Sequence, residues 1–293
     1  MFKQSPNIFA HASALKNGSF VVEDGIIFKN DDQYTLKSRE CPHRGYVMHA
    51  PGDIVKNVVC KLHGFAWDNH GKPLSQEPHC NHFYKLADKG NLELGKTGLL
   101  FENFNDANDD EWIKDLGKQT DLEFDKTIRG ESAGSCLWIM ETLTDLIHIR
   151  QNGIHPRQSL ETPLSPETFN LSEGDNYVVQ QYKNINGNSG YWVFIYPGFG
   201  VEFEPGKLLI TRITPKHKNK EFEYYWEMQL YYAPGVDSTA RAEWEKCIDV
   251  FKEDVEAVER IRKPFFPLKR TVNAWENQTK HWGNWYSKNL KKD

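Results

Sequence analysis

Short apolar runs separated by polar turns fill the first third of the chain and predict a small antiparallel β-structure. Residues 18–101 contain runs such as 20–22 and 25–28, and Asn, Asp and Gly residues separate these runs. Apolar runs bounded by turn residues are typical of short strands that pair with their sequence neighbours. The polar stretch 102–111 that follows predicts a linker or an exposed loop.

Longer apolar runs in the second half of the chain predict a larger sheet. These runs are residues 191–196, 207–213 and 223–232. They are rich in aromatic and β-branched residues, which favour strands. The turn signals Pro197-Gly198 and Pro205-Gly206, together with the charged segment 215–221, separate the runs. We therefore expect consecutive antiparallel strands of one sheet, although the alternation does not say which face lines a pocket.

A helix pattern with a polar stripe precedes this sheet region. In the segment 137–148, Glu141, Asp145 and His148 are spaced by four and then three residues. Such spacing puts all three side chains on one face of a helix.

A second helix is predicted after the sheet region, from about residue 237 to about Arg262, before Pro264. Its apolar stripe consists of Trp244, Ile248, Phe251, Val255 and Val258. At 100° per residue, Asp254 lies at the edge of this stripe and can face the protein interior, whereas Glu253 points nearly the opposite way.

Composition indicates an ordinary globular chain. A length of 293 residues suggests about two domains, and the net charge of −5 gives no reason to expect binding to nucleic acid or to an anionic membrane. No run of eighteen apolar residues predicts a membrane span, and the first residues do not resemble a secretory signal. An odd number of cysteines, five, does not suggest a disulfide framework, so a reducing cytoplasm is the expected location.

Two short couplets carry the most specific chemistry. Cys41 and His43 form a C-x-H couplet, and Cys60 and His63 form a C-x-x-H couplet. Two thiolates and two imidazoles are the ligands of a Rieske 2Fe-2S cluster, in which two cysteines hold one iron and two histidines hold the other. A structural zinc site is the alternative, but zinc fingers usually keep like ligands together, whereas each couplet here mixes cysteine with histidine. Three cysteines remain outside the couplets, namely Cys80, Cys136 and Cys247.

These motifs resemble those of the Rieske non-haem iron oxygenases. The stretch 60–71, followed by Pro73 and Pro78, is similar to the second cluster loop of that family and the hairpin after it. Respiratory and photosynthetic Rieske proteins have an extra cysteine beside each couplet, where this chain has Tyr46 and Leu62. The chain therefore resembles the oxygenase or soluble ferredoxin branch, and its length favours the oxygenase.

The resemblance implies an α+β protein with two domains. Residues 1–105 would form an all-β Rieske 2Fe-2S domain, and residues 106–293 a helix-grip catalytic domain with an antiparallel sheet and a mononuclear non-haem iron site. Family members bind this Fe(II) through D-x-x-H, a second histidine and a distant acid in an E-D pair. His148, His155 and Asp254 match these positions, although six residues separate the two histidines where the family usually has three or four.

The resemblance also gives Asp145 a catalytic role. In the family, this aspartate hydrogen-bonds a histidine of the mononuclear site and a cluster histidine of the neighbouring subunit in a head-to-tail trimer. Carried over, this contact would pair Asp145 with His63 of another subunit in a homotrimer. The remaining histidines are expected on the surface or in loops, and they are His11, His49, His70, His79, His82, His217 and His281.

The function implied is that of an oxygenase component. It would use O2, with electrons from a separate NAD(P)H-dependent reductase, directly or through a ferredoxin, to hydroxylate, demethylate or dihydroxylate a small organic substrate. The chain has no evident dinucleotide or flavin fingerprint, which is why the reductase is expected to be another protein. The alternative is a Rieske electron carrier or ligand-binding protein with a degenerate second iron site.

Overall fold

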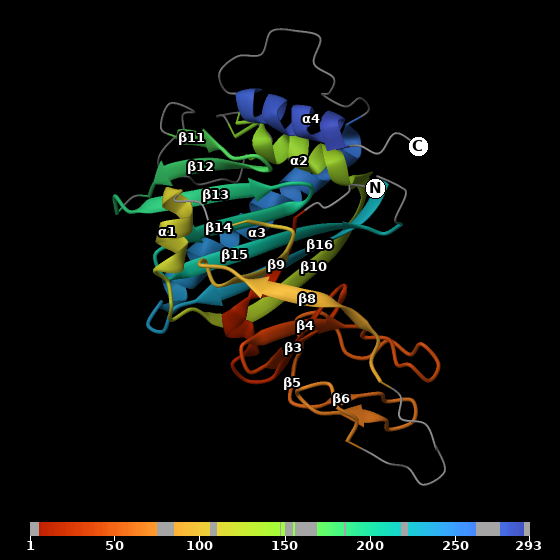
Figure 1. The fold of residues 1–293 in the computed structure, drawn as a ribbon. Coiled ribbons are helices and arrows are strands. Elements are labelled where there is room, and N and C mark those ends of the chain that lie inside the picture. Colours follow the sequence, from red (N-terminus) through yellow and green to blue (C-terminus); the bar gives the residue numbers. More distant parts are fainter. Residues whose placement is uncertain are drawn as a thin grey trace. The chain divides into compact units, whose positions relative to one another are not determined.

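The computed structural model describes residues 6–74, 85–105, 110–146, 148–149, 155, 169–184, 186–217, 222–261 and 276–289. The chain divides into two compact units (Figure 1). One unit comprises Asn7–Thr127, and the other comprises Ile128–Asp293 together with the first six residues. Predictions that involve Pro78, His79, Cys80, His82 and Pro264 fall outside the described residues.

A seven-stranded sheet with the order β1-β9-β8-β4-β3-β2-β5 forms the frame of the first unit. Its strands are β1 (Asn7–His11), β2 (Ser19–Val22), β3 (Gly25–Asn30), β4 (Gln33–Lys37), β5 (Ile54–Val55), β8 (Asp88–Leu94) and β9 (Leu99–Glu102). Adjacent strands are antiparallel, as the short apolar runs predict. A separate hairpin of β6 (Val58–Val59) and β7 (Ala66–Trp67) brackets the second couplet.

Two short helices also belong to this unit. The 3₁₀ helix η1 (Ala12–Leu15) follows β1, and α1 (Glu111–Gly117) begins at the end of the polar stretch that predicts a linker. Three apolar side chains of α1 are buried, namely Trp112, Ile113 and Leu116. With only seven residues, α1 is too short for its periodicity to stand out in the sequence.

The second unit contains a seven-stranded antiparallel sheet with the order β10-β16-β15-β14-β13-β12-β11. Its strands are β10 (Glu123–Ser135), β11 (Asn170–Glu173), β12 (Tyr177–Lys183), β13 (Ser189–Ile195), β14 (Phe199–Glu204), β15 (Lys207–Pro215) and β16 (Phe222–Tyr232). The three predicted runs correspond to β13, β15 and β16. By contrast, β14 was not predicted, because Pro197-Gly198 and Pro205-Gly206 frame its six residues so closely that the segment resembles one long turn.

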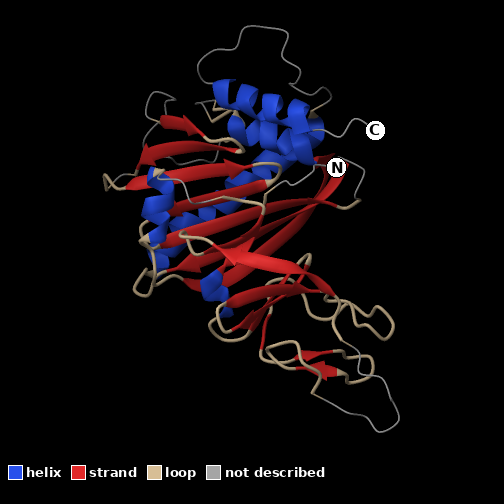
Figure 2. Cartoon of the chain, viewed as in Figure 1, coloured by secondary structure: helices blue, strands red, loops and turns tan. Residues whose placement is uncertain are grey.

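Helices α2 (Cys136–Thr144), α3 (Ser238–Arg260) and α4 (Asn277–Asn289) cover one face of this sheet (Figures 1 and 2). The predicted apolar stripe of α3 is buried against the sheet, together with the side chain of Asp254. The expected α+β class and the helix-grip arrangement are therefore confirmed. None of the helices in the described part of the chain is long and apolar enough to span a membrane.

The first predicted helix ends earlier than its sequence pattern suggests. Asp145 is the C-cap of α2 and has an extended backbone, with φ −92° and ψ 97°. The hydroxyls of Thr142 and Thr144 donate to carbonyls of the preceding turn, a competing pattern that is typical of helix ends. Asp145 and His148 therefore do not share a helical face with Glu141, and the prediction of one continuous helix to residue 148 was wrong.

Candidate metal centres

The two couplets lie on loops with the same backbone hydrogen bonds. In the first loop, the amide of Cys41 donates to Tyr46 and its carbonyl accepts from Gly45, both at 2.8 Å. In the second, the amide of Cys60 donates to Phe65 and its carbonyl accepts from Gly64, again both at 2.8 Å. The glycines have φ values of +69° and +77°, a conformation that favours glycine and closes each loop tightly.

The side chains of the couplets separate into a buried thiol pair and a more accessible imidazole pair. Cys41 and Cys60 are 2% and 0% exposed, whereas His43 is half-buried and His63 is exposed. The two Nδ1 atoms lie 3.2 Å apart, a separation at which both nitrogens could bind one metal ion. Burial, and then the neighbouring Cys60 thiol, raise the pKa of Cys41, so a metal would have to displace its proton. The four residues fit a cluster with thiolates on an inner iron and imidazoles on an outer one.

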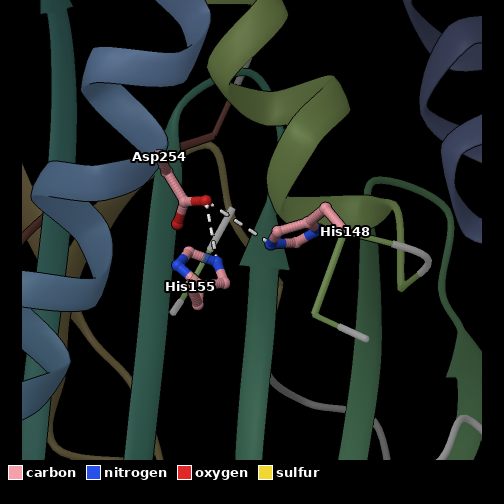
Figure 3. Close-up of side chains that lie close together, drawn as sticks. All are labelled: His148, His155 and Asp254. Atoms are coloured by element: carbon pink, nitrogen blue, oxygen red, sulfur yellow. Dashed lines mark ion pairs between the residues drawn. The ribbon is translucent and has the colours of Figure 1, made fainter. Parts of the chain in front are cut away.

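The second candidate centre brings together three side chains from distant parts of the sequence. His148 follows α2, Asp254 is on α3, and Figure 3 shows these two side chains and His155 pointing toward one another. Asp254 Oδ1 lies 3.4 Å from His148 Nε2 and 3.2 Å from His155 Nε2. One ligand atom from each residue lies within 4.8 Å of the other two. Two imidazoles and one carboxylate at these distances fit the facial triad of a non-haem ferrous ion.

The outer nitrogens of both histidines are held by acceptors. His148 Nδ1 donates to the backbone carbonyl of Asp145, and His155 Nδ1 lies 3.1 Å from Glu253 Oε2. A carbonyl and a carboxylate can only accept, so each Nδ1 has the proton and each Nε2 is left with a lone pair. His155 Nε2 and Asp254 Oδ1 are buried and make no hydrogen bond within the described part of the chain. Buried polar atoms without such a partner are the state expected of ligands that bind a metal.

Glu253 differs from the expectation drawn from its helical angle. The angle predicts a side chain that points away from the apolar stripe, yet its carboxylate reaches the outer nitrogen of His155. The glutamate side chain is long enough to reach this nitrogen from a position that points away from the stripe. Burial alone would lower the pKa of His155, but the Asp254 and Glu253 carboxylates outweigh this effect and raise it.

Asp145 contacts the candidate iron site through its backbone. Its carbonyl accepts the hydrogen bond of His148, and its side chain is half-buried at the end of α2. The contact between the Asp145 carboxylate and a cluster histidine of another subunit involves a second chain and stays a prediction.

Several polar and aromatic residues on the helix-covered side of the catalytic sheet were not singled out from the sequence. Strand register puts Trp192 beside Glu202 on the helix-facing side of the sheet, with Tyr182 and Thr211 on the same side. Alternation within β14 could have indicated that Glu202 and Glu204 share a face, but the turn signals at both ends hid the strand.

Comparisons with known proteins support the Rieske cluster centre directly. Residues 6–87 match the family of Rieske [2Fe-2S] domains. A putrescine 2-hydroxylase of Ralstonia nicotianae is 24% identical to this chain, and the alignment covers 98% of this chain and 89% of the relative.

Solved structures of Rieske monooxygenases have the same fold. The quaternary ammonium monooxygenase CntA in complex with L-carnitine matches with a TM-score of 0.69 and 12% identity, over 98% of this chain and 88% of CntA. Dicamba monooxygenase matches with a TM-score of 0.51 and 14% identity, over 98% of this chain and 97% of that protein.

The fold and the family match together define a class of protein, in which a Rieske 2Fe-2S domain is joined to a sheet-rich α+β domain. The chain is therefore a Rieske-domain protein, and along nearly its whole length it is similar to a hydroxylase and to monooxygenases of the Rieske non-haem iron type.

Proposed function

We propose that the chain is the terminal oxygenase component of a multi-protein system. It receives electrons from a separate NAD(P)H-dependent reductase, directly or through a ferredoxin, and uses O2 to hydroxylate, demethylate or dihydroxylate a small organic substrate. The observation that carries this proposal is the group of His148, His155 and Asp254, of which the last two are buried and the first half-buried, and whose ligand atoms lie within 4.8 Å of one another. A pure electron carrier has no need for such a group.

In the proposed reaction, His148 Nε2, His155 Nε2 and an Asp254 oxygen hold the mononuclear Fe(II). When bound, this iron supplies open coordination positions for O2 activation next to the substrate. The protein's contribution is to fix the ligands. The Asp145 carbonyl and the Glu253 carboxylate hold the protonated Nδ1 atoms, so neither ring can turn its ligand nitrogen away. The buried position of Asp254 keeps competing water from its carboxylate.

Electron supply is proposed to come through the 2Fe-2S cluster held by Cys41, His43, Cys60 and His63. The exposed imidazole of His63 offers a short route outward from the cluster. We propose that this route leads to the Asp145 side chain of a neighbouring subunit in a homotrimer. Inter-subunit electron transfer has been described for CntA together with one of its structures, which supports the idea by analogy.

We propose that residues 1–105 form the cluster domain and that residues 106–293 form the catalytic domain. This division is supported by the two compact units, although α1 and the first part of β10 pack with the cluster-bearing unit. We propose a cytoplasmic location, which suits thiolate ligands that must stay reduced.

Iron content tests the proposal against the electron-carrier alternative. The purified wild-type protein should contain about three iron atoms per chain, two in the cluster and one in the mononuclear site. His148→Ala should contain about two, with unchanged cluster absorbance, and should lose substrate-dependent O2 consumption. His217→Ala removes an exposed histidine of the same unit and should behave as wild type. Wild-type protein that binds only two irons, or only zinc, would contradict the proposal.

A further inference from the structure

Three neighbouring strands present a row of unusual residues to the helix-covered side of the catalytic sheet. Trp192 of β13 pairs with Glu202 of β14, which in turn pairs with Leu209 of β15. Leu209 belongs to the core formed with α2, α3 and α4, so Trp192 and Glu202 face these helices as well. Glu202 is half-buried, and a carboxylate between an indole and a leucine is an uncommon choice for a position that faces the core.

The Glu202 carboxylate makes no hydrogen bond or ion pair with the residues that the structure describes. The contrast with Glu204, two residues along the same strand, is informative. Glu204 accepts hydrogen bonds from Tyr182 and Asn184 and pairs with Lys207 at 2.8 Å. Lys207 is therefore already paired with Glu204, and no ion pair among the described residues compensates the carboxylate of Glu202.

A second polar side chain on this face of the sheet has no hydrogen-bond partner among the described residues. Thr211 is 2% exposed, and its hydroxyl has no hydrogen-bond partner within the described residues. It lies opposite Gly200, and a side chain added to Gly200 would approach Thr211 Oγ1 to 3.7 Å. Gly200 and Glu202 are alternate residues of one strand and face the same side. Because Gly200 has no side chain, none separates the Thr211 hydroxyl from the neighbourhood of Glu202.

Aromatic rings border the same position. Tyr182 and Trp192 lie with ring centroids 5.3 Å apart, and Phe169 lies 5.4 Å from Trp192. The ring of Tyr182 crosses directly over Gly190, where an added Cβ would come within 2.3 Å of it. Aromatic faces attract cations, most strongly where water is excluded.

The uncompensated carboxylate is close to the candidate iron site. Burial, and then the charge of Asp254, raise the pKa of Glu202 to about 7. Burial, and then the charge of Glu202, raise the pKa of the Cys247 thiol on α3. Cys247 lies seven residues before Asp254 on the same helical face. Glu202 therefore lies beneath α3, near the carboxylate that would bind the iron. A bound cation at this place would relieve both the burial of the charge and its repulsion by Asp254.

From this arrangement, and resting on the proposed oxygenase function, we infer that the substrate is a small aliphatic molecule with a protonated primary amine, which Glu202 and Thr211 bind beside Trp192. An ammonium group can donate to both the carboxylate and the hydroxyl. A quaternary ammonium group has no N–H to donate and would use only the charge and the rings. The hydroxyl at Thr211 therefore favours the primary amine.

Equilibrium binding to the full-length holoprotein, kept oxidised so that no turnover occurs, tests this inference. The probes are 1,4-diaminobutane, the neutral 1,4-butanediol and the quaternary ammonium choline, measured by isothermal titration calorimetry. We expect the diamine to bind at least about tenfold more tightly than the diol or choline. Glu202→Gln should weaken diamine binding about tenfold or more, and Thr211→Val about threefold or more. Glu173→Gln removes an exposed carboxylate of β11 and serves as the charge control, with binding as in wild type.

Each result has one meaning. Equal diamine binding by wild type and Glu202→Gln overturns the role of Glu202, and tighter binding of choline than of the diamine overturns the choice of a primary amine. If no amine binds while iron content and O2 consumption identify an oxygenase, the substrate class is wrong and the proposed function stands. If the diamine binds as expected but the second iron is absent, the binding site stands and the proposed function fails.

Discussion

At the scale of single residues, the candidate iron site is defined by its hydrogen bonds as much as by its ligands. An acceptor holds Nδ1 of each histidine, which leaves both Nε2 atoms directed at Asp254. His155 shows why geometry adds to sequence spacing. Its distance from His148 along the chain exceeds the usual family gap, yet it reaches the same carboxylate. Spacing along the chain does not fix distance in space when the histidine is held from another element, here by Glu253 of α3.

The Glu253 contact predicts a loss of metal affinity when its charge is removed. Glu253→Gln keeps the shape of the side chain but weakens the acceptor for His155 Nδ1, so Fe(II) affinity should fall about tenfold. Anaerobic equilibrium dialysis against Fe(II) measures it. Glu256→Gln changes an exposed glutamate of the same helix and should leave the affinity unchanged. Equal affinities for Glu253→Gln and wild type would show that His155 needs no outer partner.

His11 predicts a pH dependence of stability in the cluster-bearing unit. Contrary to the expectation of a surface or loop residue, its side chain is buried, and burial, together with nearby Lys16, lowers its pKa from 6.5 to about 4. The unfolded chain therefore binds a proton more readily between these values, so the stabilisation is complete above pH 6.5 and declines as the pH falls.

In numbers, wild type should lose about 1 kcal/mol of unfolding free energy between about pH 7.5 and about pH 5.5 from this group. Urea unfolding of wild type and His11→Asn at both pH values isolates the contribution, because all other titrating groups are common to the two proteins. The same pH dependence in both proteins would mean that His11 is not the responsible group.

At the scale of elements, long amphipathic patterns were predictable from the sequence. Short elements, and elements that lie between closely spaced turn signals, were not. The 23 residues of α3 give its apolar stripe enough turns to fix both the burial of Asp254 and the helix bounds to within two residues. In contrast, β14 is hidden between two Pro-Gly pairs, and α2 ends where threonine hydroxyls compete for helix carbonyls. Local side-chain hydrogen bonds of this kind leave no periodic signal.

The N-cap of α3 provides a test at this scale. Asp237 Oδ1 accepts a hydrogen bond from the amide of Ala240 at 2.8 Å. Asp237→Ala should cost about 1 kcal/mol of unfolding free energy without changing iron content, because the cap is far along the helix from Asp254. Asp249→Ala removes a surface ion pair with Lys252 and should cost less than half as much. Thermal unfolding followed by circular dichroism compares the two, and equal losses would contradict the capping role.

At the scale of the whole molecule, the sequence specifies the cluster site more completely than the iron site. The two couplets lie in loops with matching hydrogen bonds, so their local motifs already contain most of the geometry. The iron triad instead combines His148, which follows α2, with His155 and with Asp254, a helix residue about a hundred positions later. Residues such as Glu202 and Thr211 gain significance only from strand register, which the sequence pattern does not determine.

Assembly provides a further prediction. If Asp145 links the cluster of one subunit to the iron of the next, Asp145→Ala should stay trimeric and keep its third iron, because His148 is held by the backbone carbonyl. Cluster oxidation by O2 in the presence of substrate should slow at least about tenfold. Stopped-flow absorbance of the cluster measures this rate, with sedimentation confirming the assembly. A normal rate in the variant would exclude Asp145 from the electron route.

The proposed oxygenase function depends above all on a mononuclear ferrous ion bound by His148, His155 and Asp254. Electron paramagnetic resonance of the reduced protein after addition of nitric oxide tests it, since nitric oxide binds an open ferrous position and makes that iron visible apart from the cluster. We predict a high-spin iron-nitrosyl signal in wild type that disappears in His148→Ala and in Asp254→Ala, while the signal of the reduced cluster stays in all three. An undiminished nitrosyl signal in both variants, or none in iron-replete wild type, would contradict this assignment.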